Sequence, residues 1–315
     1  MAGFPTPTVV LSECLGIRAV RYDGGIIFDE FVETLKKYVT VVPVCPEVGA
    51  GLGVPRNPLA LYRDGNAVYL IDLKTGEDIT HRVKRYAELF LSDLVDVDGF
   101  LLKSGSPSCG IGDSKIYGRG GAVLRRSNGL FAELARSSYP LLPFESEKRL
   151  LNFGIRRNYL TRLFAISDLR ISLNNINRVE TVVELHRRYK YVLMLYSPHY
   201  LKILGKLVAE RSHIDLHKLV NLYRRYFLEA LMKNPGRGSY ANVFTHLYSH
   251  LKDRMSIQER DYLKSLIDEY RVGRETLKAL IAYFKGFIYR LGDRYLEEQK
   301  FLEPYPPELE VGIPV

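Results

Sequence analysis

The sequence predicts an α/β domain with a parallel, doubly wound, Rossmann-like sheet over residues 1–145, followed by an all-α domain over residues 146–315. Two patterns support this division. In the first part, short apolar segments alternate with amphipathic helical segments, as they do in parallel sheets. From residue 146 onward the pattern is helical throughout. Charge divides at the same place, with 16 Lys and Arg against 17 Asp and Glu before it and 29 against 19 after it.

Short apolar segments in the first part are expected to form buried parallel strands. They cover residues 8–12, 39–44, 95–102 and 139–144, with a weaker edge strand over 68–72. Between them, apolar residues recur three or four positions apart, which is the spacing of a helix with one buried face. The predicted helices cover residues 29–38, 80–94 and 122–136. This alternation predicts helices on both faces of one sheet.

The second part is predicted to be a bundle of amphipathic helices. They cover residues 148–164, 178–196, 199–211, 216–232, 240–255, 257–272 and 274–291. Ser256 and Glu259 have the spacing of a capping box. Apolar runs are all shorter than a membrane span, and the first residues lack the pattern of a signal peptide, so we expect a cytoplasmic protein without membrane contact. The oligomeric state stays open.

The chain has three cysteines, and each follows a predicted strand: Cys14, Cys45 and Cys109. A free cysteine is often just a small buried hydrophobic residue. However, the carboxyl ends of parallel strands meet at one edge of a sheet, where open α/β sheets bind ligands. Three cysteines at three strand ends therefore predict a shared site. Disulfide frameworks have many cysteines, usually in even number, so three cysteines do not suggest one. They indicate free thiols or metal ligands in a reducing compartment.

The spacing between these cysteines, 31 and 64 residues, differs from the closely spaced pairs of zinc ribbons. A 4Fe–4S cluster held by three cysteines would leave one iron without a protein thiolate. That open iron would be a thiophilic Lewis acid, suited to a substrate sulfur. A fourth ligand from histidine or a carboxylate would instead make the site structural or redox-active.

Several motifs resemble the thiouracil desulfidase (TudS) family across about residues 8–145. They are Ser12-x-Cys14-Leu15, Val20-Arg21-Tyr22-Asp23-Gly24-Gly25, Pro43-Val44-Cys45-Pro46-Glu47-Val48, Pro55-Arg56, Gly76-x-Asp78-Ile79-Thr80 and Lys103-x-x-Ser106-Pro107-Ser108-Cys109-Gly110. The helical part is similar to the domain appended in longer, RudS-type members, which are associated with removing sulfur from 4-thiouridine in tRNA. Its matching motifs are Leu185-His186-x-x-Tyr189-Lys190, Asn242-Val243-x-x-His246 and Tyr295-Leu296-x-x-Gln299-x-Phe301-Leu302-x-Pro304-Tyr305-Pro306.

This resemblance implies a 4Fe–4S cluster with three cysteine ligands and a thiolated uracil or uridine substrate. The substrate sulfur binds the open iron, and water then replaces sulfur, which leaves as sulfide without net redox change. Glu47 matches the acid/base glutamate of the family, which activates the water. Ser106 matches its serine, with Ser104 and Ser108 as alternatives.

Structural roles explain some of these residues equally well. Glu47 could simply stabilise a helix N-terminus, and Ser106 and Ser108 could form the turn around Pro107. Tyr22 and Asp23 could frame the substrate or build a glycine turn.

The positive charge of residues 146–315 predicts a polyanionic partner, most simply tRNA. Three arginine pairs are candidate phosphate contacts: Arg156 with Arg157, Arg187 with Arg188, and Arg224 with Arg225. Alternatively, these charges belong to a solvent-exposed helical surface with many ion pairs and bind no polyanion.

Two rival functions follow from the same residues. One is a dehydratase-type enzyme that uses the open iron on a hydroxy acid. The other is a nucleic-acid-binding protein whose cysteines hold a structural metal. Release of sulfide from a thiolated substrate separates both from a desulfidase.

Overall fold

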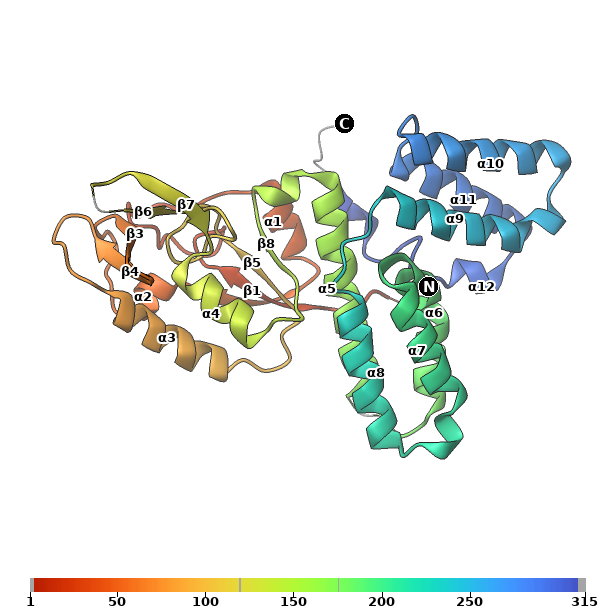
Figure 1. The fold of residues 1–315 in the computed structure, drawn as a ribbon, viewed down its shortest axis with the longest axis horizontal. Helices are drawn as coiled ribbons and strands as arrows, with labels where there is room; N and C mark the ends of the chain where they lie inside the picture. The colour runs from red at the N-terminus through yellow and green to blue at the C-terminus, as the bar shows by residue number, and fades with distance from the viewer. Residues whose placement is uncertain (1–2, 119, 175, 311–315) are drawn as a thin grey trace. The chain divides into compact units, whose positions relative to one another are not determined.

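The computed structural model describes residues 3–118, 120–174 and 176–310. The chain divides into two compact units, which Figure 1 shows as ribbons. The first unit is Met1–Asp168 together with Tyr305–Val315, and the second is Leu169–Pro304. The first unit therefore extends past residue 145, the expected end of the α/β domain.

The main sheet of the first unit is parallel, as the sequence predicted. Its strands are β1 (Thr8–Ser12), β2 (Thr40–Val44), β5 (Gly99–Leu102) and β8 (Phe144–Ser146), in the order β2-β1-β5-β8. All neighbouring strands in this sheet pair in parallel. Because the chain proceeds outward from β1 to β2 and then returns to the other side of β1, the strand order reverses between β1 and β5. Ligands bind at such reversals, outside the carboxyl ends of the strands.

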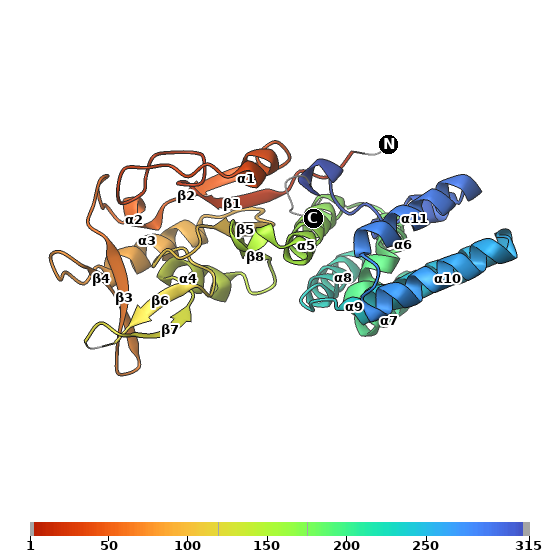
Figure 2. The ribbon, with the colours of Figure 1, turned by 90° about the horizontal axis from the view of Figure 1, so that it is seen from above.

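Helices cover both faces of this sheet (Figures 1 and 2). Residues of α1 (Glu30–Leu35) and α5 (Phe153–Leu173) pack in one core cluster with Val9 and Leu11 of β1. Residues of α3 (Thr80–Ser92) and α4 (Leu130–Ser138) pack in another with Val10. Successive side chains of a strand point to opposite faces, so β1 contributes to both cores. The doubly wound fold class is confirmed.

A second, smaller sheet belongs to the same unit. Its strands are β3 (Leu59–Asp64), β4 (Ala67–Asp72), β6 (Ser114–Tyr117) and β7 (Val123–Ser127), in the order β4-β3-β6-β7. β4 is an edge strand, as predicted, but it pairs with β3 in antiparallel and belongs to this separate sheet, so the prediction of one sheet is wrong. The predicted helix over 122–136 is wrong at its start, because Val123–Ser127 pairs with β6 in antiparallel and α4 begins only at Leu130. Local periodicity could not reveal this pairing between separate segments.

The second unit is helical, which confirms the predicted all-α part. Its helices are α6 (Glu180–Tyr196), α7 (Pro198–Ala209), α8 (Leu216–Ala230), α9 (Arg237–Leu251), α10 (Ile257–Val272), α11 (Leu277–Leu291) and α12 (Arg294–Glu297). Single-turn 3-10 helices lie at Arg211–His213 and Lys252–Arg254 of this unit, and at Arg149–Leu151 and Pro307–Glu310 of the first unit. Ser256 and Glu259 form the predicted capping box at the start of α10. Within the described ranges, no helix combines the length and hydropathy needed to cross a bilayer.

Candidate active site

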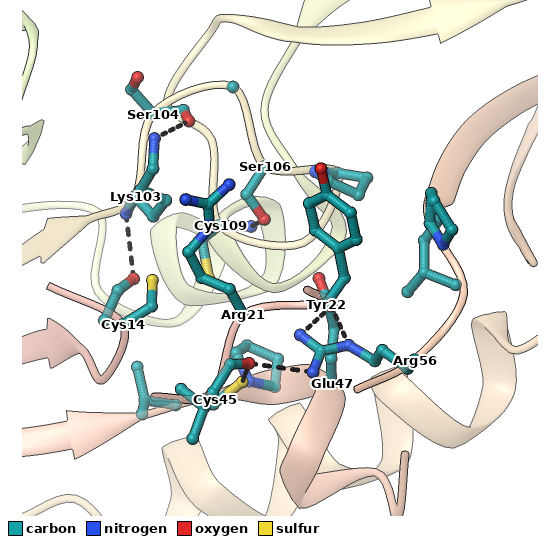
Figure 3. A pocket seen from close by; sticks show the side chains of 18 residues that line it. Cys14, Arg21, Tyr22, Cys45, Glu47, Arg56, Lys103, Ser104, Ser106 and Cys109 are labelled. Atoms are coloured by element: carbon teal, nitrogen blue, oxygen red, sulfur yellow. Dashed lines mark hydrogen bonds and ion pairs between the residues drawn. The ribbon is translucent and has the colours of Figure 1, made fainter. Parts of the chain in front are cut away.

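The three cysteines lie beyond the carboxyl ends of three adjacent strands. Cys14 follows β1, Cys45 follows β2, and Cys109 lies on the loop after β5. Cys45 also begins the short helix α2 (Pro46–Gly49). All three side chains line one cavity of about 310 Å³ (Figure 3). The structure thus brings the three thiols to a common cavity, as their positions after the strands predicted.

Burial raises the pKa of each of the three thiols. It raises the pKa of Cys14 to about 12, with repulsion from Cys45 as the second cause. Burial is also the largest cause of the raised pKa of Cys45 and of Cys109. Thiolates at these positions therefore need a nearby cation, which is what a metal centre supplies. Among the described residues, no three His, Cys, Asp or Glu side chains are arranged to hold a single metal ion.

Glu47 lies on α2 with its carboxylate held at both oxygens. Only 8% of the residue is exposed. Its Oε2 contacts Nε of Arg56 at 2.7 Å and Nη2 of Arg56 at 2.5 Å. Its Oε1 accepts a hydrogen bond from the Ser108 hydroxyl at 2.9 Å. Because both oxygens have partners, the carboxylate has one fixed orientation at the cavity wall.

Arg56 connects Glu47 with the loop after β1. Its Nη1 donates to the Val20 carbonyl at 2.9 Å, and its backbone N–H donates to the Tyr22 carbonyl at 2.8 Å. Arg56 belongs to the Pro55-Arg56 motif, to which the sequence assigns no role. Its position after Pro55 was the available signal, but nothing local indicated that it would contact Glu47.

The serines of the loop after β5 have different positions. Ser106 lines the cavity, and its Oγ accepts hydrogen bonds from the backbone N–H groups of Ser108, at 3.2 Å, and Cys109, at 3.1 Å. Ser104 also lines the cavity. Ser108 is buried outside the lining and binds Glu47 instead. The turn around Pro107 is therefore organised by Ser106, which still faces the cavity.

An ion pair between Lys103 and Glu147, which the sequence did not predict, fixes the start of this loop. Nζ of Lys103 contacts Oε1 of Glu147 at 2.9 Å and donates to the Ser104 carbonyl at 2.7 Å. Oε2 of Glu147 accepts from the backbone N–H of Ser104 at 2.8 Å. Lys103 also lines the cavity and lowers the pKa of Cys14, opposing burial. No local signal predicted this pair, because its members are 44 residues apart.

Tyr22 and Asp23 differ in their position relative to the cavity, although they are adjacent in the sequence. Tyr22 lines the cavity, with its ring partly exposed (Figure 3). Asp23 is not among the lining residues. Its carboxylate accepts from the backbone N–H of Gly25 at 3.0 Å and pairs with Arg21 at 3.4 Å. Asp23 therefore builds the turn, where Gly24 has a φ of +77°.

The predicted phosphate contacts at Arg156 and Arg157 are wrong. These residues are only 1% and 4% exposed and belong to the first unit. The Arg156 guanidinium lies 4.3 Å from the ring centroid of Phe31 and donates to the Leu150 carbonyl. Arg157 pairs with Glu310 at 3.1 Å. Helix α5 packs against the sheet, so this pair faces the core rather than solvent.

Arg187 and Arg188 of the second unit contact acidic neighbours. Arg187 pairs with Glu184 at 2.8 Å and also with Glu298. These two carboxylates raise the pKa of Arg187 above its usual value. Arg188 lies 3.8 Å from Glu184. Glu184 and Glu298 therefore partly neutralise the positive charge that the two arginines could use to bind a polyanion.

Comparison with known proteins identifies relatives of both parts of the chain. Residues 9–147 match the family model of 2-thiouracil desulfurase, and residues 190–306 match a family described as a protein of unknown function (DUF1722). The uncharacterized protein YbgA of Escherichia coli is 30% identical over 150 residues, covering 47% of this chain and 88% of YbgA. The uncharacterized protein YbbK of Bacillus subtilis is 30% identical over 111 residues, covering 33% of this chain and 74% of YbbK.

A solved structure of the 4Fe–4S-dependent thiouracil desulfidase TudS is 33% identical and covers 46% of this chain and 93% of that one, with a TM-score of 0.38. The family assignment comes from the sequence matches. The chain belongs to the 2-thiouracil desulfurase family, in a form that carries an additional C-terminal domain.

Proposed function

We propose that this chain replaces the sulfur of a thiolated uracil ring with oxygen and releases sulfide. One observation carries the proposal: three thiols and a buried, oriented carboxylate share one cavity at the reversal point of a parallel sheet. The family match supports the same substrate class.

We propose that Cys14, Cys45 and Cys109 hold a 4Fe–4S cluster. A cluster of this kind distributes its ligands over different irons, so its cysteines need not converge as closely as the ligands of one ion. The position of all three cysteines at one cavity supports a shared cluster. When bound, the cluster would supply an open iron that polarises the C=S bond of the substrate.

Glu47 is the proposed acid/base residue. The oxygen of a water molecule bonds to the carbon of the C=S group, and Glu47 accepts one water proton at its carboxylate and passes it to the sulfur. The C–S bond then breaks, sulfur leaves with the electron pair as hydrosulfide, and the second water proton is lost to solvent as the C=O bond forms. Its contacts with Arg56 and Ser108 hold the carboxylate in place throughout. The reaction requires no external oxidant or reductant.

Ser106 and Tyr22 are proposed to orient the ring. The Ser106 oxygen accepts two backbone hydrogen bonds, so its own hydroxyl proton can be directed to a ring oxygen or nitrogen. The partly exposed Tyr22 ring at the cavity wall offers a stacking surface for the pyrimidine.

The test is anaerobic sulfide release from 4-thiouracil and 2-thiouracil by protein reconstituted with iron and sulfide. The Glu47→Gln variant should keep its iron but lose at least about a hundredfold in rate, since an amide cannot accept the proton. Glu88→Gln removes an exposed carboxylate from α3 and serves as the matched control. Wild-type turnover by Glu47→Gln would remove Glu47 from the mechanism.

The same assay separates the two rival functions. A dehydratase-type enzyme would release no sulfide from either thiobase and would instead consume a hydroxy acid. A nucleic-acid-binding protein with a structural metal would show no turnover at all, and Glu47→Gln would leave its binding intact.

We further propose that the physiological substrate is 4-thiouridine within tRNA. The net positive charge of residues 146–315 supports a polyanionic substrate. Arg156 and Arg157 have no part in this proposal, because they are buried. Comparing sulfide release from thiolated tRNA with release from free 4-thiouracil tests it, and a preference for the free base would contradict it.

A further inference from the structure

The small sheet of the first unit has one core face and one face rich in aromatic and basic side chains. Leu61 of β3 and Ile116 of β6 are register partners, and both are buried in one core cluster. Their neighbours along each strand point the opposite way. On that opposite face β6 carries Lys115 and Tyr117, and β3 carries Tyr62.

Two positive charges lie directly opposite each other on this face. Lys115 of β6 is the register partner of Arg126 of β7, and both residues are exposed. Like charges in directly opposed positions of a sheet destabilise the pairing. Nη1 of Arg126 donates to the Asp113 carbonyl at 3.1 Å, which uses one of the five N–H donors of a guanidinium. An anion bound between the two side chains would offset their repulsion.

A pair of tyrosines continues the face. Tyr62 and Tyr117 are register partners in neighbouring strands, and their ring centroids are 5.7 Å apart. Aromatic side chains beside basic ones form the surface on which single-stranded nucleic acids stack their bases.

The same face adjoins the candidate active site. Lys115, Tyr117 and Arg126 line a second cavity of about 300 Å³, in which Asp113 is the one acidic residue among the described lining residues, against these two cations. Leu59, Gly105 and Pro107 line both this cavity and the one that holds the three cysteines. Leu59 of β3 and the Gly105–Pro107 loop, which carries Ser106, therefore lie between the two cavities. Lys115 and Arg126 thus lie on the other side of this shared wall from the three cysteines.

We propose that Lys115 and Arg126, with the Tyr62–Tyr117 pair, form an RNA-binding groove for the nucleotides that flank the thiolated base. This inference rests on the proposed function and adds the location of the RNA contact. The two cations bind backbone phosphates, and the tyrosines stack against an unpaired base. The groove lies in the domain whose net charge over residues 1–145 is −1, so local placement and not overall charge creates it.

Binding of a short, fluorescein-labelled single-stranded RNA with one 4-thiouridine tests the groove, measured by anisotropy on the full chain. Lys115→Ala/Arg126→Ala should weaken binding about tenfold. It should also make the slope of log affinity against log salt less negative by about 1.4, for two lost phosphate contacts. Its kcat/KM for sulfide release from free 4-thiouracil should change less than about twofold, since neither residue touches the base. Tyr62→Leu should weaken RNA binding with an unchanged salt slope, because stacking is not an ionic contact.

Lys84→Ala/Arg85→Ala is the matched control, because it removes two exposed charges from α3 of the same unit. Unchanged RNA affinity in Lys115→Ala/Arg126→Ala would overturn the proposal, and so would an equal loss in the control. Failure of the proposed function can be told apart from failure of the groove. If the proposed function is wrong, wild-type protein releases no sulfide from any thiolated substrate. The RNA affinities of the variants still decide whether the groove binds RNA.

Discussion

Two nitrogens of Arg56 contact the same carboxylate oxygen of Glu47: Nε lies 2.7 Å and Nη2 lies 2.5 Å from Oε2. Both side chains are nearly buried. Such a pair fixes the direction of the carboxylate toward the cavity that the cysteines line. Breaking a buried pair by removing one partner leaves the other charge uncompensated, which makes Arg56 a positioning residue for Glu47.

Replacing Arg56 should therefore reduce activity in a graded way. We expect Arg56→Ala to lower kcat for sulfide release at least about tenfold, and Arg56→Lys to recover part of it, because lysine keeps the charge but not the planar fork. Iron content and thermal unfolding of both variants, measured beside the rates, separate positioning from loss of the cluster or the fold. Full turnover by Arg56→Ala would contradict this role.

Each cysteine should be needed for iron binding. After anaerobic reconstitution the wild-type chain should hold about four irons, and Cys14→Ala, Cys45→Ala and Cys109→Ala should each lose most of them. Iron and sulfide assays with the visible absorption spectrum measure this. Ser106→Ala, on the same loop as Cys109, should retain the cluster. Stoichiometric zinc in place of iron would refute the proposed cofactor.

Phe164 of α5 should be critical for the stability of the first unit. It is fully buried beside Phe4 and Tyr305, with ring centroids 6.3 and 6.4 Å away. Phe164→Ala should lower the free energy of unfolding by about 3–5 kcal/mol. Phe28, which is 79% exposed, supplies the control Phe28→Ala, expected to be nearly neutral. Urea unfolding of the two variants gives the comparison, and similar losses would contradict the prediction.

A truncation after residue 145 should destabilise the α/β domain for the same reason. It would remove α5 and the segment around Tyr305, which share a core cluster with Val9 and Leu11. We expect such a protein to be less soluble and to unfold at a lower temperature than the full chain. If the truncated protein and the full chain unfolded at the same temperature, α5 and the segment around Tyr305 would not be needed to stabilise the sheet.

His186 of α6 should make the stability of the second unit depend on pH. Burial, followed by repulsion from Lys190, holds the pKa of His186 below its usual value. Below about pH 6.5 the unfolded chain therefore binds a proton that the folded chain resists, so stability falls as pH drops toward the lower folded pKa. Urea unfolding at pH values from about 7.5 to about 5.5 measures this dependence. The free energy of unfolding should decline less with falling pH in His186→Gln than in wild type.

Exposed His213 provides the matched control for this prediction. His213→Gln should retain the wild-type decline. An identical pH dependence in wild type and His186→Gln would show that another group is responsible.

Sequence alone determined the alternation of strands and helices, the helical second part and the position of each cysteine after a strand. These features follow from local spacing. A period of two or 3.6 residues decides which side chains share a face, and the carboxyl ends of parallel strands necessarily meet at one edge. The capping box at Ser256 is likewise a contact between residues three positions apart.

Only the tertiary structure decided which charged residues are buried and which partners they meet. Arg156 and Arg157 looked like a basic surface pair, yet α5 packs them into the first unit. The contact between Lys103 and Glu147 joins residues 44 positions apart, and the opposition of Lys115 to Arg126 exists only once β6 and β7 pair. Such contacts depend on neighbours brought together by folding, and no periodicity along the chain encodes them.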